Sequence, residues 1–512
     1  MRRLSAAFAL VLMLVVVDAV EAAAVTAEQT TPAPSARDIA LIDAVTWGVT
    51  GSTVKAFEAM GAEGWLQAQL RPSADARLPE AAQKQINALP SAEKTPLDLA
   101  MEFDAQGHAA NQITDPVQKA AAQHAFQQAM TDIAHQAATR TILRALYAPD
   151  QLRERMTWFW FNHFNVHQYK ANVRVLVGDY EDRAIRAHAL GRFRDLLEAT
   201  LRHPAMLRYL DNADNAAGHI NENYAREIME LHTMGVGSGY TQKDVEELAR
   251  ILTGVGVDIK PENPKLKPEL QGKFIRVGLF EFNPARHDFG DKVFLGHAIK
   301  GRGFVEVEEV LDILSREPAT ARHISREIAT YFTSDDPPST LVDRMAQTFT
   351  NTDGDIASVL ETLFRAPEFT ASLGKRFKDP TRYVLSAVRL AYDDKVILNS
   401  APIQNWLNRL AEGLYNHQTP DGYPMTSSAW NGSGQMMTRF EIARQIGSNS
   451  AGLFKSAEQD AVDKPAFPLL ENALYFGSLN RMLGSPTRAA LDEAVSPQDW
   501  NTLFLSSPEF MN

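Results

Sequence analysis

The spacing of its apolar residues constrains the fold of this chain more than any other feature. From about Ile39 onward, apolar residues recur every three to four positions, the period of an amphipathic α-helix. The pattern is clearest at 118–147, 152–167, 179–200, 222–234, 242–252 and 383–392. Helix start signals agree, since Thr241 and Asp244 have the spacing of a capping box and Asp353-Gly354 precedes a helical pattern at 356–364. The sequence therefore predicts a mainly α-helical protein.

One region breaks this period. Residues 260–301 contain four prolines and two short β-like runs, 274–277 and 293–295. After residue 40 the sequence has neither a repeat of solenoid period nor a linker long enough to separate independent domains. We therefore expect one large multi-helix domain over 39–512, with an irregular, partly β insertion around 260–300.

The N-terminus predicts export. Met1-Arg2-Arg3 is basic, 4–17 are apolar, and the small residues at 20–24 offer a cleavage site, so 1–24 match a signal peptide. A retained membrane anchor is the alternative, but the apolar run is short for a bilayer span. Residues 25–38 follow as a polar linker. We expect a secreted or periplasmic protein without stable membrane insertion after signal cleavage.

Composition excludes several classes of function. The chain carries 51 Lys and Arg against 63 Asp and Glu, a formal net charge of −12, and it lacks a basic run. Nucleic acid and anionic membrane surfaces are therefore excluded as primary partners. Because cysteine is absent, so are disulfides, iron–sulfur clusters, thiolate zinc sites, Cys nucleophiles and a lipoprotein anchor.

The first segment with chemical potential is 156–167. At 100° per residue, Met156, Phe159, Trp160, His163 and His167 share one helix stripe. Two imidazoles one turn apart can share a metal ion. The alternative is that His163 is a buried histidine bonded to a backbone carbonyl and that His167 caps the helix end.

The second segment, 221–235, is polar on nearly every side of a predicted helix. Its polar residues include Asn221, Glu222, Arg226, Glu227, Glu230 and His232, whereas Tyr224, Ile228, Leu231 and Gly235 form its apolar face. Glu222 and Arg226 have the spacing of a helix ion pair. The segment is either a capped helix with surface ion pairs or the wall of a functional pocket.

The third segment lies in the irregular insertion. His287-Asp288, followed by Gly290 and Lys292, can supply metal ligands, or a base and the carboxylate that orients it. The alternative is a turn that Asp288 closes onto its own backbone.

Together these segments resemble a known family. The motifs are WFWFNHF at 158–164, NENYARE…ELHT…GV at 221–236, YT…DV at 240–245 and HD-x-G-x-K…LG at 287–296. With Asp421-Gly422-Tyr423-Pro424 and the later Ser507-Pro508-Glu509-Phe510, they are similar to the bacterial "domain of unknown function 1800" family over roughly 40–512. The family's usual Gly-Trp-Pro element reads Gly422-Tyr423-Pro424 here, and His167 is not among its recognised positions.

The resemblance implies an exported, largely helical protein. Members are typically encoded beside a partner of the "domain of unknown function 1501" family, which looks related to alkaline-phosphatase-like and sulfatase-like enzymes. An exported phosphatase- or sulfatase-like protein is therefore the expected partner. The resemblance brings no catalytic activity with it.

The leading hypothesis is an exported, hydrolase-like enzyme that acts on an envelope or extracellular glycan-type substrate through a buried carboxylate and histidine pocket. Glu227 or Glu230 would be its general base, and His287 with Asp288 an oriented acid/base or metal-ligand pair. The expected substrate-binding residues are Asn162, Asn221, Glu222, Arg226 and Lys292, with Arg226 binding anionic groups.

One divalent metal ion is the candidate cofactor, because several buried carboxylates require a cation or shared protons. Its candidate ligands are His163, His232 and His287. The rival hypothesis is a non-catalytic envelope scaffold or partner of a neighbouring exported enzyme. A third is carbohydrate binding without turnover, with Trp406, Tyr423 and Trp430 as stacking platforms.

Overall fold

The computed structural model describes residues 34–74, 76–260, 262–455 and 466–512. Over these residues the chain is mainly α-helical and its strands form two small antiparallel sheets, which confirms the predicted fold class. Within the same ranges, no helix combines the length and the apolar character that crossing a membrane requires. The predicted signal peptide, 1–24, and most of the predicted linker, 25–38, lie outside the described residues.

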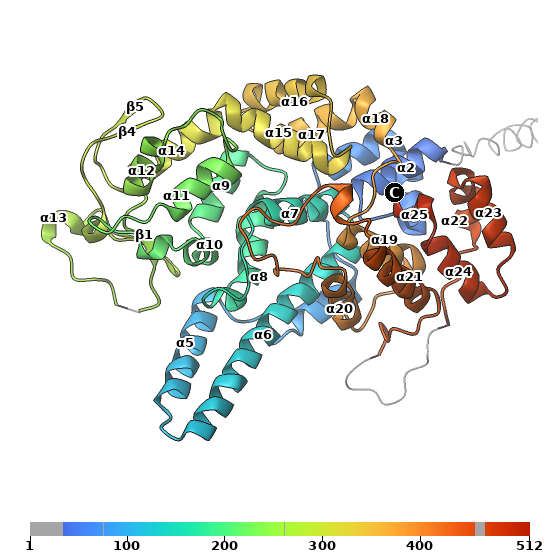
Figure 1. Cartoon of the computed structure of the whole chain (residues 1–512), viewed down its shortest axis with the longest axis horizontal. Coiled ribbons are helices and arrows are strands. Elements are labelled where there is room, and N and C mark those ends of the chain that lie inside the picture. Colours follow the sequence, from blue (N-terminus) through green and yellow to red (C-terminus); the bar gives the residue numbers. More distant parts are fainter. Residues whose placement is uncertain (1–33, 75, 261, 456–465) are drawn as a thin grey trace, which may run out of the picture.

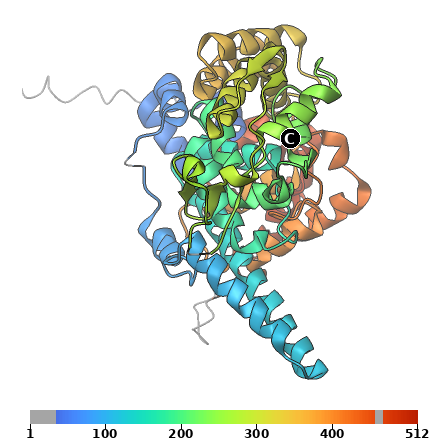
Figure 2. The same ribbon diagram turned by 90° about the vertical axis from the view of Figure 1, so that its left-hand side faces the viewer.

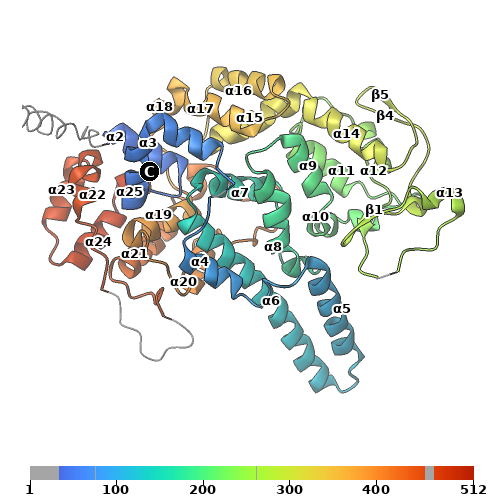
Figure 3. The same cartoon turned by 180° about the vertical axis from the view of Figure 1, so that it is seen from behind.

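The N-terminal part leads into a projecting helical arm. Its first helices are α2 (Ala36–Val45), α3 (Gly51–Leu70) and α4 (Glu80–Asn87). Next, α5 (Pro96–Gln112) and the long α6 (Pro116–Tyr147) form a hairpin that projects from the rest of the molecule (Figures 1 and 2). The view from behind shows α4 packed against α6 (Figure 3).

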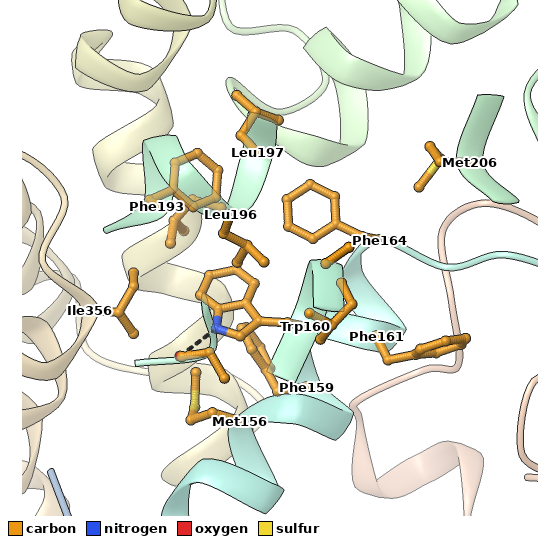
Figure 4. Packing of buried hydrophobic residues seen from close by; sticks show 14 of the residues in the cluster. Met156, Phe159, Trp160, Phe161, Phe164, Phe193, Leu196, Leu197, Met206 and Ile356 are labelled. Carbon is orange, nitrogen blue, oxygen red and sulfur yellow. Dashed lines mark hydrogen bonds between the residues drawn. The ribbon is translucent and has the colours of Figure 1, made fainter. Parts of the chain in front are cut away.

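Aromatic residues of α7 (Gln151–His163) lie at the centre of the larger hydrophobic cluster. Trp160 is fully buried and contacts Phe193 of α9 (Phe193–Leu201) with a ring separation of 5.9 Å (Figure 4). Its indole N–H donates a hydrogen bond to the carbonyl of Ala189 at 2.9 Å, which satisfies the polar atom of the ring. Because α7 is fixed in this way, the residues at its C-terminal end have defined positions.

The predicted insertion is partly β, as expected. After α10 (Pro204–Tyr209) and α12 (Gln242–Ile251), its elements are β1 (Val255–Val257), α13 (Pro268–Gln271), β2 (Ile275–Val277), β3 (Phe280–Phe282), β4 (Lys292–Phe294) and β5 (His297–Ile299). The order of the first sheet is β1-β3-β2, with Phe282 opposite both Val255 and Ile275. The second sheet is the β4–β5 hairpin, in which Lys292 pairs with Ile299.

The remaining helices complete two hydrophobic clusters. One group is α14 (Phe304–Arg316), α15 (Pro318–Phe332), α16 (Ser339–Asn351), α17 (Ile356–Phe364) and α18 (Pro367–Ser372). The other is α19 (Pro380–Tyr392), α20 (Ala401–Arg409), α21 (Ser433–Gly447), α22 (Ala473–Gly477), α23 (Ser485–Asp492), α24 (Pro497–Leu505) and α25 (Pro508–Met511). The clusters adjoin, since Trp158 and Leu414 pack against both. That 39–512 form a single domain stays a prediction.

Three predicted helices are shorter or more broken than expected. Helix α7 ends at His163, four residues before the predicted end, because Asn165 and Gln168 bond to a distant loop instead of continuing the helix. The predicted helix 179–200 is divided into α8 (Val177–Asp179), the π-helix η2 (Tyr180–Ile185), the 3₁₀ turn η3 (Arg186–His188) and α9. The predicted helix 222–234 is α11 (Asn223–Glu227) followed by the π-helix η5 (Ile228–His232).

Candidate functional site

Residues 412–423, called the crossing loop below, run across α7 and bring the C-terminal part of the chain to the predicted motifs (Figure 1). The backbone N–H of Gln168 donates to the carbonyl of Tyr415 at 3.0 Å, and the Tyr209 hydroxyl donates to the carbonyl of Gln418 at 2.9 Å. The Asn165 amide donates to the carbonyls of His417 and Thr419 at 3.1 and 2.8 Å. The loop is thus attached to α7 and α10 along its length.

Asn162, a predicted substrate-binding residue, holds this loop through two hydrogen bonds. Its amide donates to the carbonyl of Tyr423 at 2.9 Å, and its side-chain oxygen accepts from the Tyr423 N–H at 2.7 Å. Between them, Gly422 has a φ of 72°, and a Cβ there would lie 2.2 Å from the backbone oxygen of Asn162. The close approach explains why glycine stands at this position.

Glu227 lies beside the crossing loop at the end of α11, where the π-helix begins. Its side chain is half-buried, and its carboxylate makes no hydrogen bond or ion pair with the residues described by the structure. Burial raises the pKa of Glu227 above its ordinary value of 4.5; the carboxylate of Glu230 raises it further, Arg226 opposes the shift, and Asp421 of the crossing loop adds to it. Glu227 is therefore the predicted carboxylate that remains available for proton transfer.

The other charged residues of α11 bind one another. Arg226 is held by Glu222 at 3.2 Å and Glu230 at 3.3 Å, and it also donates to the Gln242 side chain at 2.8 Å. Gln242 donates back to Glu222 at 2.8 Å. Because its partners already occupy the guanidinium, the predicted role of Arg226 in binding anionic groups receives no support from this geometry.

Asn221 shapes the loop before α11. Its backbone N–H donates to the side chain of Asn215 at 3.0 Å, and its side-chain oxygen accepts from the N–H of Asn223 at 3.0 Å. The Asn221 amide reaches the carbonyl of Asp211 at 3.4 Å. The side chain of Asn221 therefore stabilises the local loop structure.

Three histidines gather on the inner side of this segment. The ring centroid of His163 lies 6.2 Å from that of His232 and 6.1 Å from that of His323. The rings of His163 and His323 donate to the carbonyls of His232 and Leu231, each at 3.2 Å. These bonds tie α7 and α15 to the backbone of the π-helix, as the alternative reading of His163 expected.

Burial keeps the imidazoles of His163 and His232 neutral. It lowers the pKa of His163 well below 6.5, and the nearby His323 and His232 contribute to the shift. Burial, with a smaller contribution from His323, lowers the pKa of His232 to about 3. Both ring nitrogens of His232 are buried without a hydrogen-bond partner among the described residues. His167 lies beyond the end of α7, so it does not share the stripe of His163.

The motif His287-Asp288…Lys292 forms a closed network beside the first turn of α14. His287 Nε2 lies 3.0 Å from Glu306 and Lys292 Nζ lies 2.6 Å from the same carboxylate, and all three side chains are fully buried. The backbone N–H of Gly303 also donates to Glu306, at 2.7 Å. Burial alone would raise the pKa of Glu306, but the bonds from His287, Lys292 and Gly303 hold it below its ordinary value.

Asp288 faces a different partner from His287. Arg250 of α12 donates to it at 2.8 Å, and this bond, more than any other contact, lowers the pKa of Asp288. The N–H of Gly290 also donates to Asp288 at 2.8 Å, which closes the turn that the sequence offered as the alternative reading. His287 and Lys292 are therefore inaccessible to a substrate in this conformation.

The candidate metal ligands do not converge. His287 contacts Thr253, Glu306 and two phenylalanines, whereas His163 and His232 lie together beside α11. In the parts of the chain that the structure describes, no group of three or more His, Asp or Glu side chains is placed to hold a metal ion. His163, His232 and His287 therefore do not form one metal site here.

The comparison with protein families decides the relationship. The model of the family "Protein of unknown function (DUF1800)" matches residues 40–512, nearly the whole chain. This chain belongs to the DUF1800 family. No curated protein and no solved structure matches it. In this DUF1800 protein, the motifs at 158–164 and 421–424 meet through Asn162 and Tyr423, and the motif at 221–235 lies beside them.

Sequence reasoning missed some residues of this site. Asp421 was noted only as part of a motif, and Tyr209 was not singled out, yet both lie within electrostatic range of Glu227. The motif Asp421-Gly422-Tyr423-Pro424 was the sequence signal that could have identified Asp421 as a site residue. Trp406 and Trp430, the proposed stacking platforms, are 1% and 5% exposed, so they are not available for stacking against a sugar.

Proposed function

We propose that this DUF1800 protein is a hydrolase-like enzyme in which Glu227 transfers the proton. The observation that carries the proposal is a half-buried carboxylate without a hydrogen-bond or ion-pair partner among the described residues, next to residues that are almost all bonded. A partly buried carboxyl with a raised pKa costs stability, and such costs are typical of catalytic positions. The π-helix that starts after Glu227 also supports the proposal, since these distortions recur at functional sites.

Asp421 is the proposed second carboxylate. Its side chain is 65% exposed, whereas Glu227 is half-buried, so the two carboxyl groups have different environments. The hydroxyl of Thr419 donates a hydrogen bond to Asp421 at 2.5 Å. Two carboxyls in such different surroundings can divide the roles of acid and base. Glu227 would act as the acid and deliver its proton to the leaving group, and Asp421 would act as the base.

The proposed substrate is an uncharged, hydroxyl-rich chain of the glycan type. Glu222, Glu230 and Asp421 give this part of the surface a negative charge, and the guanidinium of Arg226 is held by Glu222 and Glu230. Such a surface repels anionic groups, whereas carboxylates readily accept hydrogen bonds from sugar hydroxyls. An envelope or extracellular glycan also agrees with the predicted export.

Activity assays on purified protein test the proposal. The chain is incubated with peptidoglycan sacculi, with exopolysaccharide and with aryl glycosides, and new reducing ends or released aryl groups are counted. We expect turnover of at least one of them, and a loss of about 100-fold or more in Glu227→Gln, the usual contribution of a general acid or base. The control is Glu246→Gln, which changes a half-exposed glutamate of α12 and should retain full activity.

Turnover that is equal in wild type and Glu227→Gln would refute the role of Glu227. A Glu227→Gln variant that is inactive and also clearly less stable than wild type would count against the proposal too, because the loss would then follow from damaged structure.

The rival proposal is a non-catalytic scaffold or partner of an exported phosphatase- or sulfatase-like protein. The closed network of His287, Lys292 and Glu306 supports it, since a motif of the family serves internal structure there. Under this proposal no glycan is turned over, and the purified chain forms a complex with its partner. Size-exclusion chromatography of the two proteins together, with Glu227→Gln as a variant that should still bind, separates the rivals.

A further inference from the structure

A cavity lies where the two hydrophobic clusters meet, on the inner side of the crossing loop. It has about 40 Å³ of room for the centres of water-sized molecules, which is enough for several waters or a small organic ion. Five aromatic rings line it, those of Trp47, Trp158, Phe161, Tyr415 and Tyr423. Trp158 and Tyr423 are also partly exposed, so the cavity lies within reach of the surface on their side.

Two carboxylates face this aromatic space without an ion-pair partner among the described residues. Glu181 of the π-helix η2 is 5% exposed and accepts hydrogen bonds from the hydroxyls of Thr141 and of Tyr415, the latter at 2.8 Å. Glu412 is 1% exposed, and one of its oxygens accepts from the N–H and hydroxyl of Thr381 at 2.7 and 2.8 Å. Its other oxygen, Oε1, is buried without any donor among the described residues.

Nearby cations do not neutralise this pair directly. Arg439 lies within electrostatic range of Glu412, but its guanidinium donates to the carbonyl of Lys378 and lies over the rings of Phe377 and Tyr383. By contrast, Glu154, the third carboxylate of the lining, is paired with an arginine, Arg186, at 2.5 Å. Within the described part of the chain, Glu412 Oε1 therefore has no donor, although a buried carboxylate oxygen ordinarily has one.

The protonation of the two carboxyls would be coupled to the binding of a cation in this cavity. Burial raises the pKa of Glu181 to about 7, and burial raises the pKa of Glu412 well above its ordinary value, with Asp379 adding to the shift. A cation that enters the cavity would favour the ionised form of both groups and would release their protons.

We propose that this cavity is a binding site for a small organic ammonium ion. An ammonium ion with N–H groups would donate a hydrogen bond to Glu412 Oε1, which has no donor among the described residues, and a quaternary ammonium ion would make a short charge contact with it. Glu181 adds a second negative charge to the lining. The aromatic rings attract the cation through their faces and exclude water. A bare metal ion fits less well, because hard cations take six or more oxygen ligands, whereas this lining is mostly aromatic and aliphatic. This site is separate from Glu227, and the inference does not depend on the proposed hydrolase activity.

Titration calorimetry on the purified full chain at pH 7.5 tests the proposal. The probes are ethanolammonium and tetramethylammonium, with 1-propanol as the neutral counterpart of ethanolammonium and potassium chloride as the inorganic control. We expect saturable one-to-one binding of at least one ammonium ion, with a Kd below about 1 mM, and binding of 1-propanol and potassium that is weaker by about tenfold or more.

Variants place the binding in this cavity. Glu412→Gln, which keeps an oxygen to accept from Thr381, should weaken ammonium binding by about tenfold or more, as should Glu181→Gln. The matched control is Glu93→Gln, which changes an exposed glutamate elsewhere and should leave binding unchanged. Circular dichroism establishes that each variant is folded. The proposal is overturned if neither ammonium ion saturates, if 1-propanol or potassium binds as tightly, or if folded Glu412→Gln and Glu181→Gln bind like wild type.

Discussion

Replacing Lys292 with methionine is the sharpest test of the buried network at α14. The change keeps the length of the side chain but removes the charge that lies 2.6 Å from Glu306. Glu306 then retains His287 at 3.0 Å and the N–H of Gly303 at 2.7 Å, so its carboxylate is only partly compensated. Removal of one partner from a fully buried ion pair costs about 3–5 kcal/mol of unfolding free energy.

This cost converts into a measurable shift of the melting temperature. With an unfolding entropy of about 2.1 cal/mol/K per residue, a chain of 512 residues loses about one degree for each kcal/mol, so Tm should fall by about 3–5 °C. The matched control is Lys300→Met in the same hairpin, where the ion pair with Asp291 is 71% and 61% exposed. The control should change Tm little, because solvent screens exposed pairs.

The pH dependence of the stability loss in Lys292→Met provides a second test. The pKa of Glu306 is lower in the folded chain than its ordinary 4.5, so its stabilising contribution is present above pH 4.5 and is lost as the pH falls through the folded value. The deficit of Lys292→Met should therefore be larger at pH 7 than at pH 4. Equal Tm values for Lys292→Met and Lys300→Met at pH 7 would refute the structural role assigned to this motif.

Two further predictions concern the cavity and the crossing loop. Glu181 has a pKa of about 7 in the folded chain against 4.5 ordinarily, so the unfolding free energy of the wild type should fall by on the order of 3 kcal/mol between pH 4.5 and 7. Glu181→Gln should lack this loss when unfolding in urea is measured over the same pH range. An identical pH dependence in both proteins would contradict the assignment. Gly422→Ala should destabilise the crossing loop by about 1–3 kcal/mol and speed its cleavage in limited proteolysis, since a Cβ there meets Asn162 at a φ of 72°. Its control is Gly272→Ala, which has open space around it, and equal cleavage rates would count against the argument.

Local patterns in the sequence predicted most of the helices, because amphipathic spacing and capping depend on neighbouring residues. The capping box at Thr241 and Asp244 is present at the start of α12, and the predicted helix 356–364 coincides with α17. The insertion around 260–300 was recognised because prolines and β-branched runs interrupt the helical period.

The breaks inside helices could not be predicted in the same way. A single π-helical turn inside a helix is too short to break the apolar pattern, so 222–234 matched a continuous helix although η5 begins at Ile228 and spans only five residues. The end of α7 at His163 depends on bonds from Asn165 to a loop more than 250 residues away. Such partners are invisible to any local pattern.

The same limit applies to the candidate site. The sequence identified Glu227 and His287 as comparable candidates, but their surroundings differ. The half-buried carboxylate of Glu227 has no hydrogen-bond or ion-pair partner among the described residues, whereas His287 is enclosed with Glu306 and Lys292. Glu181 and Glu412 carried no recognisable motif, because only the fold brings these distant positions to one cavity.

The unfolding free energy of Glu227→Gln relative to wild type, measured in denaturant from pH 4 to pH 8, tests the central claim most directly. The pKa of Glu227 is raised in the folded chain, so its stabilising contribution is present below its ordinary pKa of 4.5 and is lost as the pH rises through the folded value. Glutamine does not titrate in this range. We predict that the variant is at least as stable as wild type at pH 8 and that its advantage grows from pH 4 to pH 8. A variant that is clearly less stable than wild type at pH 8 would show that the carboxylate of Glu227 supports the fold, and it would contradict the role proposed for this residue.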